Sequence, residues 1–245
     1  MRSSLPSSQP GIPTHPTFRT VFHAASHHDH GQRRRESMLS AFPHLTDSEF
    51  CDACTRLVQS FQQGGSLQQE WLSVDTLNRN EISYLRITKP LLHHAKSSLD
   101  DENDEVLEDD EEVLLEPSTP QPTIHYDIIL SPTYSVPVLY ISIRDTQHRY
   151  PPTMHTLYEH LVPAQFKAQA EKVGVMGGIT ITDHPVTSKP VFFIHPCRTA
   201  EVMEASIERG RNITAEEYLV VWMGSLGKSV GLDVPLALAT RNNAS

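Results

Sequence analysis

Long apolar runs are missing from this sequence of 245 residues, and no stretch approaches the ~20 apolar residues that a membrane-spanning helix needs. The N-terminal region contains Ser, Pro and His without an apolar run, so we do not expect a secretory signal. Only three cysteines are present, too few for a disulfide framework in a chain of this length. We therefore expect a cytoplasmic protein with reduced thiols and no integral membrane association.

An even distribution of charge is also missing. The formal net charge is −10, but residues 100–116 contain eleven acidic residues and no basic one. Outside that segment, 19 acidic residues face 20 basic ones, so the rest of the chain is close to neutral. The composition therefore indicates neither a nucleic-acid-binding surface nor a surface for anionic membranes.

Two segments lack the apolar content of a folded domain. Residues 1–43 are rich in Ser, Pro and His, and residues 96–122 are acidic and without periodicity. Such compositions bury too little apolar area to offset the entropy of ordering the chain. We expect a disordered tail at 1–43 and one folded domain at 44–240, interrupted by a disordered insertion at about 96–122. A short tail follows at 241–245, and we predict no metal or cofactor site.

Helix and strand signals fill the expected domain. Three pairs, Thr46 with Glu49, Thr156 with Glu159 and Thr214 with Glu217, have the spacing of a capping box that opens a helix. Alternating apolar residues predict strands at 71–74, 82–88, 123–130 and 137–144, and a short apolar strand at 191–194. A further helix is expected at about 199–207. This order predicts an α+β domain with a central antiparallel sheet of about four strands flanked by helices.

Cys197 is the residue whose local pattern points to chemistry. It follows the short apolar strand, comes directly after Pro196 and precedes an expected helix. The amide dipoles of that helix and the charge of Arg198 would favour the thiolate, which is the nucleophilic form of cysteine. Free cysteine is also among the most buried residue types, so a small core residue is the alternative interpretation.

The segment 190–199, PVFFIHPCRT, is similar to the active-site signature of the autophagy ubiquitin-like-conjugating enzymes. Three further segments resemble that family in the same order: a central strand at 134–140, YSVPVLY; a pre-active-site loop at 179–185, ITITDHP; and a C-terminal segment at 231–236, GLDVPL. The resemblance is specific from about residue 123 to 239. It implies a ubiquitin-conjugating-enzyme-like fold. Within the family, the chain is more similar to the protein-conjugating members than to their lipid-conjugating sisters.

The resemblance also implies a reaction and its partners. An activating enzyme, autophagy-related protein seven, would load the modifier, autophagy-related protein twelve, onto Cys197 as a thioester. A lysine of the acceptor, autophagy-related protein five, would then attack and form an isopeptide bond. The enzyme would be cytoplasmic, with transient visits to preautophagosomal membranes. No cofactor is implied.

One residue of ordinary ubiquitin-conjugating enzymes is absent. They carry a His-Pro-Asn tripeptide whose Asn stabilises the oxyanion, but here His184-Pro185 is followed by Val186. The resemblance leaves Tyr134, Tyr140, His195 and backbone amides near Cys197 as candidate helpers. The two tyrosines are equally well explained as packing residues, and His195 either aids proton transfer or shapes the turn before Pro196. We expect His184 to fix its loop rather than to act as a base.

Three other functions remain open on the sequence. Cys197 with His184 or His195 would suit a cysteine hydrolase, although no well-framed His and Asp or Asn pair is evident. A non-catalytic module that binds the modifier would keep the fold without using the thiol. The lipid-conjugating activity of the sister enzymes is the third alternative.

Overall fold

The structure is a computed structural model, which describes residues 38–64, 70–92, 120–167, 178–236 and 238. Most of the expected tail and insertion therefore lie outside the described residues. Of the segment expected to be the N-terminal tail, residues 38–43 are described, and Phe42 contacts the ring of Tyr218 edge-on. None of the helices in the described ranges is long and apolar enough to cross a membrane.

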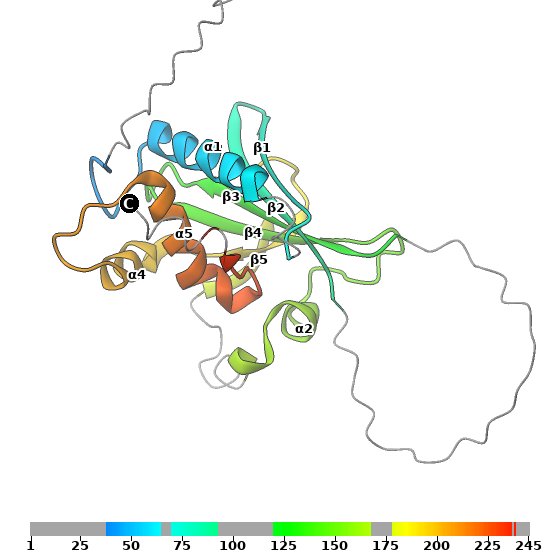
Figure 1. Ribbon diagram of the computed structural model, residues 1–245. Helices are drawn as coiled ribbons and strands as arrows, with labels where there is room; N and C mark the ends of the chain where they lie inside the picture. Colours follow the sequence, from blue (N-terminus) through cyan, green and yellow to red (C-terminus); the bar gives the residue numbers. More distant parts are fainter. Residues whose placement is uncertain (1–37, 65–69, 93–119, 168–177, 237, 239–245) are drawn as a thin grey trace, which may run out of the picture. The chain divides into compact units, whose positions relative to one another are not determined.

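A six-stranded antiparallel sheet forms the centre of the described domain (Figure 1), so the expected count of about four strands is wrong and the α+β class is confirmed. The strands lie in the order β1-β2-β3-β4-β6-β5. Their bounds are β1 Ser73–Arg79, β2 Ile82–Pro90, β3 Thr123–Leu130, β4 Pro137–Arg144, β5 Ile179–Asp183 and β6 Pro190–Ile194. The bounds of β3 and β4 match the expected ones.

The two edge strands are the ones that the sequence indicates poorly. The strand expected at 71–74 overlaps only the start of β1, which continues to Arg79 with mostly exposed polar residues. The segment 179–185, expected as a loop, instead forms the edge strand β5, in which only Ile179 is buried. Edge strands bury little on either face, so their sequences lack a full apolar alternation.

Two hairpin connections bring strand ends to the end of the sheet that carries Cys197. Arg79 pairs with Ile82, so only Asn80 and Glu81 connect β1 to β2, and both have positive φ angles of 51° and 65°. This is the backbone of a type I′ hairpin turn, which matches the right-handed twist of paired strands. The connection from β3 to β4 reverses the chain at the same end, because Leu130 pairs with Pro137.

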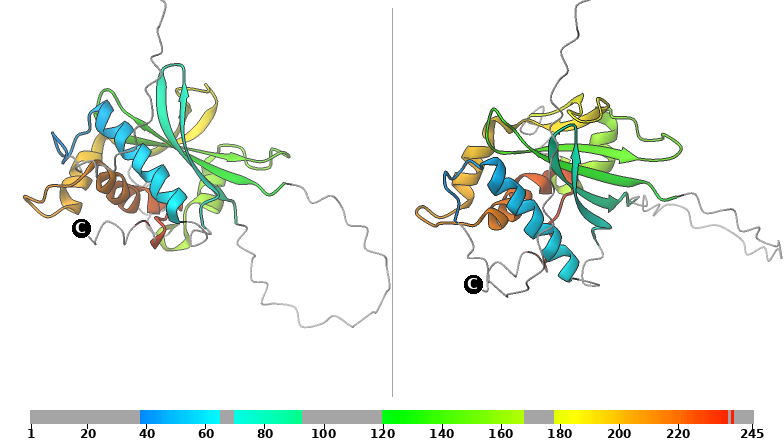
Figure 2. Two further views of the ribbon diagram at one scale, coloured as in Figure 1. Left: turned by 45° about the horizontal axis from the view of Figure 1, so that its top comes forward. Right: turned by 90° about the horizontal axis from the view of Figure 1, so that it is seen from above.

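Helices cover one face of the sheet. In Figures 1 and 2, α1 (Asp47–Gly64), α4 (Thr199–Ser206) and α5 (Ala215–Leu226) lie together on one side of it. The even-numbered residues of β3, and the residues that pair with them in the neighbouring strands, point toward these helices. Together with helix residues they form the core, which includes Phe50, Leu57, Ile87, Tyr126, Ile141 and Trp222. Each fully buried side chain of this size contributes about 1.5–3 kcal/mol.

The capping boxes define the helix starts correctly in two of three cases. Glu49 accepts from the backbone N–H of Thr46 and donates its own to the Thr46 hydroxyl, and Thr214 with Glu217 does the same for α5. The prediction for Thr156 is wrong. Thr153 caps the short helix α2 (Met154–Thr156), and Thr156 lies buried within it, before the π-helical turn η2 (Leu157–Leu161).

The opposite face of the sheet is not covered by these helices. Because side chains alternate along a strand, Arg86 of β2, Asp127 of β3 and Tyr140 and Ser142 of β4 share this second face. The loop that contains His184 lies against it, since the rings of Tyr84 and Tyr140 contact the His184 ring. The second face of the sheet therefore carries a row of polar side chains on the strands that lead to the end where Cys197 lies.

Candidate active site

Cys197 lies at the junction between a strand and a helix. Strand β6 ends at Ile194, the 3₁₀ turn η4 (Pro196–Arg198) follows, and α4 continues directly from it. The Cys197 side chain belongs to an exposed residue. A thiol enclosed by apolar side chains could not carry another protein, so this exposure meets the first requirement for a thioester nucleophile.

His195 shapes the turn that carries Cys197. Its Nδ1 accepts a hydrogen bond from the Cys197 backbone N–H at 3.1 Å, which makes His195 the N-terminal cap of η4. The Nδ1 lone pair is therefore occupied, and Nε2 is the nitrogen that faces away from the turn's backbone. The same bond occupies the Cys197 amide, so that amide does not point to a substrate oxyanion in this conformation.

A groove of about 620 Å³ leads to the two residues that precede Cys197. It lies at the end of the sheet where β1 turns into β2 and β3 into β4. Its walls contain the apolar side chains Phe50, Ile82, Ile129, Leu130, Val138 and Phe193, the two carboxylates of Asp47 and Glu81, and the candidate helpers Tyr134, Tyr140 and His195. No lysine or arginine is among the described residues that line it.

The structure thus brings three of the expected helpers together. The ring of Tyr134 meets the His195 ring edge-on at 5.7 Å, and Tyr134 is 41% exposed. Tyr140 is half-buried against Phe193, with ring centroids 5.2 Å apart. Burial raises the pKa of Tyr140, so its phenol stays protonated at neutral pH and can donate a hydrogen bond.

His184 is buried and fixes the loop after β5. Its Nδ1 accepts from the backbone N–H groups of Val186 and Thr187, at 3.1 and 3.3 Å, and its Nε2 lies 3.0 Å from a carboxylate oxygen of Asp127. Nδ1 is therefore hydrogen-bonded to the loop backbone, and Nε2 faces the Asp127 carboxylate. Val186, which occupies the position of the missing Asn, contributes its backbone to this loop.

Asp127 and Arg86 form a buried ion pair behind the loop, which the sequence did not reveal. Arg86 Nε and Nη2 bond the two carboxylate oxygens at 2.6 and 2.7 Å. Burial alone would raise the pKa of Asp127, but the hydrogen bonds from Arg86 and His184 and the charge of Arg86 lower it below its ordinary value. The signal available in the sequence was the polar residue Asp127 within the apolar strand β3. Its partners could not be recognised, because Arg86 lies 41 residues upstream and His184 lies in a separate loop.

The other cysteines differ in environment from Cys197. Cys54 lies on the buried face of α1, where burial raises the pKa of its thiol far above the ordinary range. Cys51 is exposed and lines the groove. Partial burial of its thiol is the largest cause that raises its pKa, and the negative charges of Asp47 and Asp52 raise it as well. A raised pKa lowers the thiolate fraction, so neither thiol is suited to nucleophilic attack.

Comparisons with known proteins show which proteins this chain resembles. The family described as "Autophagocytosis associated protein, active-site domain" matches residues 49–237. The chain is 31% identical to the ubiquitin-like-conjugating enzyme ATG10 of Gibberella zeae, over 82% of this chain and 98% of that protein. It is 32% identical to the human enzyme of the same name, over 46% of this chain and 51% of the human protein. A crystal structure of the autophagic E2 Atg10 aligns with a TM-score of 0.39 at 12% identity, covering 78% of this chain and 99% of that one.

A match over most of the chain, together with more than 30% identity across nearly a whole relative, identifies the family. Enzymes of this kind are transferases that work with a ubiquitin-like modifier, an activating enzyme and a target. The chain belongs to the autophagocytosis-associated active-site-domain family and is an E2-like ubiquitin-like-conjugating enzyme.

Proposed function

We propose that Cys197 accepts autophagy-related protein twelve from the activating enzyme, autophagy-related protein seven, and passes it to a lysine of autophagy-related protein five. The observation that carries this proposal is the exposed thiol at the β6–η4 junction, beside a groove lined by His195, Tyr134 and Tyr140. The groove supplies room for an extended C-terminal tail or an acceptor lysine at His195 and Pro196, the two residues that precede Cys197. The relatives' name, ubiquitin-like-conjugating enzyme ATG10, supports the reaction type.

The reaction consists of two acyl transfers. The Cys197 thiolate attacks the carbonyl carbon of the modifier's C-terminal glycine, and the bond between that carbon and the cysteine sulfur of the activating enzyme breaks. The neutral amine of the acceptor lysine then attacks the same carbon from about 3–3.5 Å. The carbon–sulfur bond breaks, Cys197 leaves as a thiolate, and the proton of the new amide nitrogen passes to solvent or to a base.

Both steps pass through a tetrahedral oxyanion, which needs a hydrogen-bond donor. Val186 cannot replace the side-chain amide of Asn, and the Cys197 N–H already donates to His195. We assign the donor role to Tyr140, whose hydroxyl has no hydrogen-bond partner among the described residues and whose raised pKa keeps it protonated. Tyr134 and His195 complete the same wall of the groove and orient the tail and the turn.

The arrangement of the histidines disfavours hydrolysis. A cysteine hydrolase needs a histidine that can take the thiol proton and is oriented by a carboxylate or amide. His184 contacts Asp127, but it is only 3% exposed and its Nδ1 is already bonded to the loop backbone. Among the described residues, His195 forms no ion pair with a carboxylate. The two carboxylates that line the groove, Asp47 and Glu81, come from other elements.

A thioester assay tests the proposal. The full-length protein is mixed with activating enzyme, ATP and modifier, and the products are separated on a non-reducing gel. We expect an adduct that is lost on addition of thiol, is absent in Cys197→Ala and becomes a thiol-resistant oxyester in Cys197→Ser.

Cys51→Ala is the matched control, because Cys51 is also exposed and lines the same groove. This variant should load the modifier like the wild type. Loading that survives Cys197→Ala would contradict the assignment, and spontaneous cleavage of a fused modifier would indicate a hydrolase. A parallel arm with phosphatidylethanolamine vesicles in place of the acceptor protein distinguishes lipid conjugation.

A further inference from the structure

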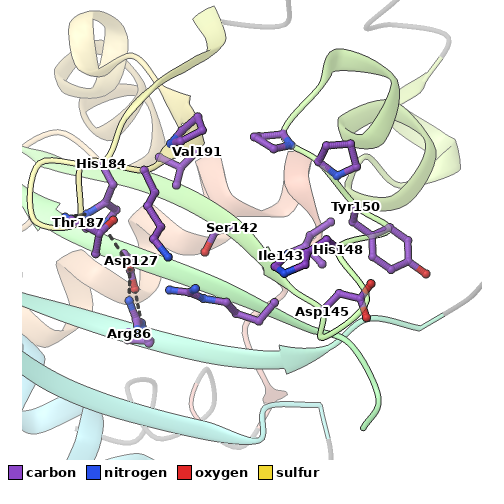
Figure 3. Close-up of a pocket in the computed structure, with 15 residues that line it drawn as sticks. Arg86, Asp127, Ser142, Ile143, Asp145, His148, Tyr150, His184, Thr187 and Val191 are labelled. Atoms are coloured by element: carbon purple, nitrogen blue, oxygen red, sulfur yellow. Dashed lines mark hydrogen bonds and ion pairs between the residues drawn. The ribbon is translucent and has the colours of Figure 1, made fainter. Parts of the chain in front are cut away.

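A second cavity lies at the opposite end of the sheet from Cys197. It has a volume of about 350 Å³ and is formed by the second face of the sheet, the connection after β4 and the segment that leads into β6. In Figure 3, Arg86, Asp127 and His184 lie at one end of the cavity, His148, Tyr150 and Asp145 at the other, and Ser142 between them. The groove beside Cys197 shares none of these residues.

The charges of this cavity are unequally compensated. Asp127 is paired with Arg86, and Asp145 is paired with Arg149, 2.9 Å away. Arg144 and Lys189 also line the cavity, and both are exposed. Neither has a carboxylate partner in the part of the chain that the structure describes. Two positive charges are therefore left without a counter-charge around one cavity.

His125 is a buried neighbour of this cavity, and its pKa responds to Arg144 among other causes. It pairs with Ser142 across β3 and β4, and its Nδ1 is buried without a hydrogen-bond partner among the described residues. Burial is the largest cause that lowers the pKa of His125 to about 4; the charge of Arg86 adds to it, the charge of Asp127 opposes it, and the charge of Arg144 makes the smallest lowering contribution. Arg144 thus acts on a buried group at this end of the sheet, although burial is the main reason why His125 stays neutral.

The remaining walls suit a peptide. Three prolines, Pro151, Pro152 and Pro190, and the rings of Tyr150 and His148 form rigid surfaces around the cations. The hydroxyl of Ser142 adds a donor near the centre (Figure 3). Rigid apolar walls with a few convergent polar groups are typical of ligand sites. Guanidinium and ammonium groups form strong, charge-assisted hydrogen bonds with carboxylates.

We propose that this cavity is a binding site for an acidic peptide segment, whose carboxylate side chains are held by Arg144 and Lys189. The segment that we propose is residues 100–116 of this chain, which contain eleven acidic residues. The connection that contains them leaves the sheet at Pro90 and returns at Thr123, which pair with each other, and Thr123 also pairs with Arg144.

A binding measurement tests the site. The probe is a fluorescein-labelled synthetic peptide of residues 99–117. The receptor is the full chain with the eleven acidic residues of 100–116 changed to Asn or Gln, which removes internal competition. We expect saturable binding by fluorescence polarisation at 50 mM salt, weakening steeply at 500 mM salt because the Debye length shrinks. A peptide with the same residues changed to Asn and Gln should not bind.

The variant Arg144→Ala/Lys189→Ala should bind the probe at least tenfold more weakly. Its matched control is Arg79→Ala/Arg209→Ala, which removes the same charge from two exposed arginines outside the cavity and should weaken binding less than twofold. Because all four side chains are exposed, both variants should keep the wild-type melting temperature. Equal weakening in the two variants, or no saturable binding at 50 mM salt, would overturn the proposal.

A final arm tests the occupant. Because residues 100–116 of the chain occupy the site, the unmodified full chain should bind the probe more weakly than the neutralised receptor. Equal binding by the two would overturn this occupancy and leave an acidic segment of another protein as the occupant. None of these measurements involves Cys197, so the result is independent of the thioester assay.

Discussion

The groove beside Cys197 and the cavity at the other end of the sheet are built on the same strands but differ in charge. The described residues of the groove include two carboxylates and no lysine or arginine, whereas the cavity has two uncompensated cations. The groove is also richer in large apolar side chains. The two ends of the sheet are therefore suited to ligands of different charge.

A single dipeptide separates the two regions. His184 lines the cavity, and Pro185, the next residue, lines the groove. His184 is fixed from behind by Asp127, which is itself held by Arg86. Substitutions among His184, Asp127 and Arg86 should therefore affect both the groove and the cavity. Substitutions of residues that line only one of them should affect only that one.

The largest effect is expected from Asp127→Asn. The change leaves the half-buried Arg86 without its partner and removes the anchor of His184, so the free energy of unfolding should fall by about 2–4 kcal/mol. Urea unfolding measures this loss. Glu201→Ala, which breaks the exposed pair with Arg198, should cost less than about 1 kcal/mol. Equal losses of unfolding free energy in the two variants would mean that the pair of Arg86 and Asp127 stabilises the fold no more than an exposed ion pair does.

A smaller effect is expected from the pH dependence of stability at the cavity end. The unfolded chain protonates His125 near its ordinary pKa of 6.5, but the folded chain does so only at about 4. Stability is therefore lost as the pH falls from about 6.5 to 4. A full shift of this size corresponds to roughly 3 kcal/mol, which solvent screening of the half-buried ring reduces to about 1–2 kcal/mol.

Urea unfolding at pH 7 and pH 4.5 measures this loss, which should shrink in His125→Gln. It should also shrink in Arg144→Ala, because Arg144 is one cause of the lowered pKa of His125. An unchanged pH dependence in both variants would separate His125 from the field of the cavity.

The smallest free-energy effect is expected at the groove end, from Tyr140→Phe. Loss of one oxyanion donor should slow discharge of the thioester to the acceptor lysine about tenfold, or about 1.4 kcal/mol. Single-turnover discharge on a non-reducing gel gives this rate. Tyr134→Phe is the matched control in the same groove and should change it less than threefold. An unchanged rate in both variants would assign the tyrosines to packing, because phenylalanine keeps the ring and loses only the hydroxyl.

Local signals in the sequence were sufficient for the parts of the fold that depend on neighbouring residues. The capping boxes of α1 and α5 involve residues three positions apart, and the alternation of β3 and β4 reflects burial of one face by helices. Edge strand β5 and most of β1 were missed because edge strands bury little. The misplaced cap at Thr156 has a different cause: the hydroxyl of Thr153, three residues earlier, competes for the same capping role.

By itself, the sequence determined the family, the α+β class and the position of Cys197 between a strand and a helix, because these depend on short motifs and local periodicity. Only the tertiary structure decided that His184, Asp127 and Arg86 meet, that Tyr134, Tyr140 and His195 share one groove, and that Arg144 and Lys189 flank another cavity. Strand pairing and loop packing create these neighbours from residues tens of positions apart, and no local pattern encodes such distances.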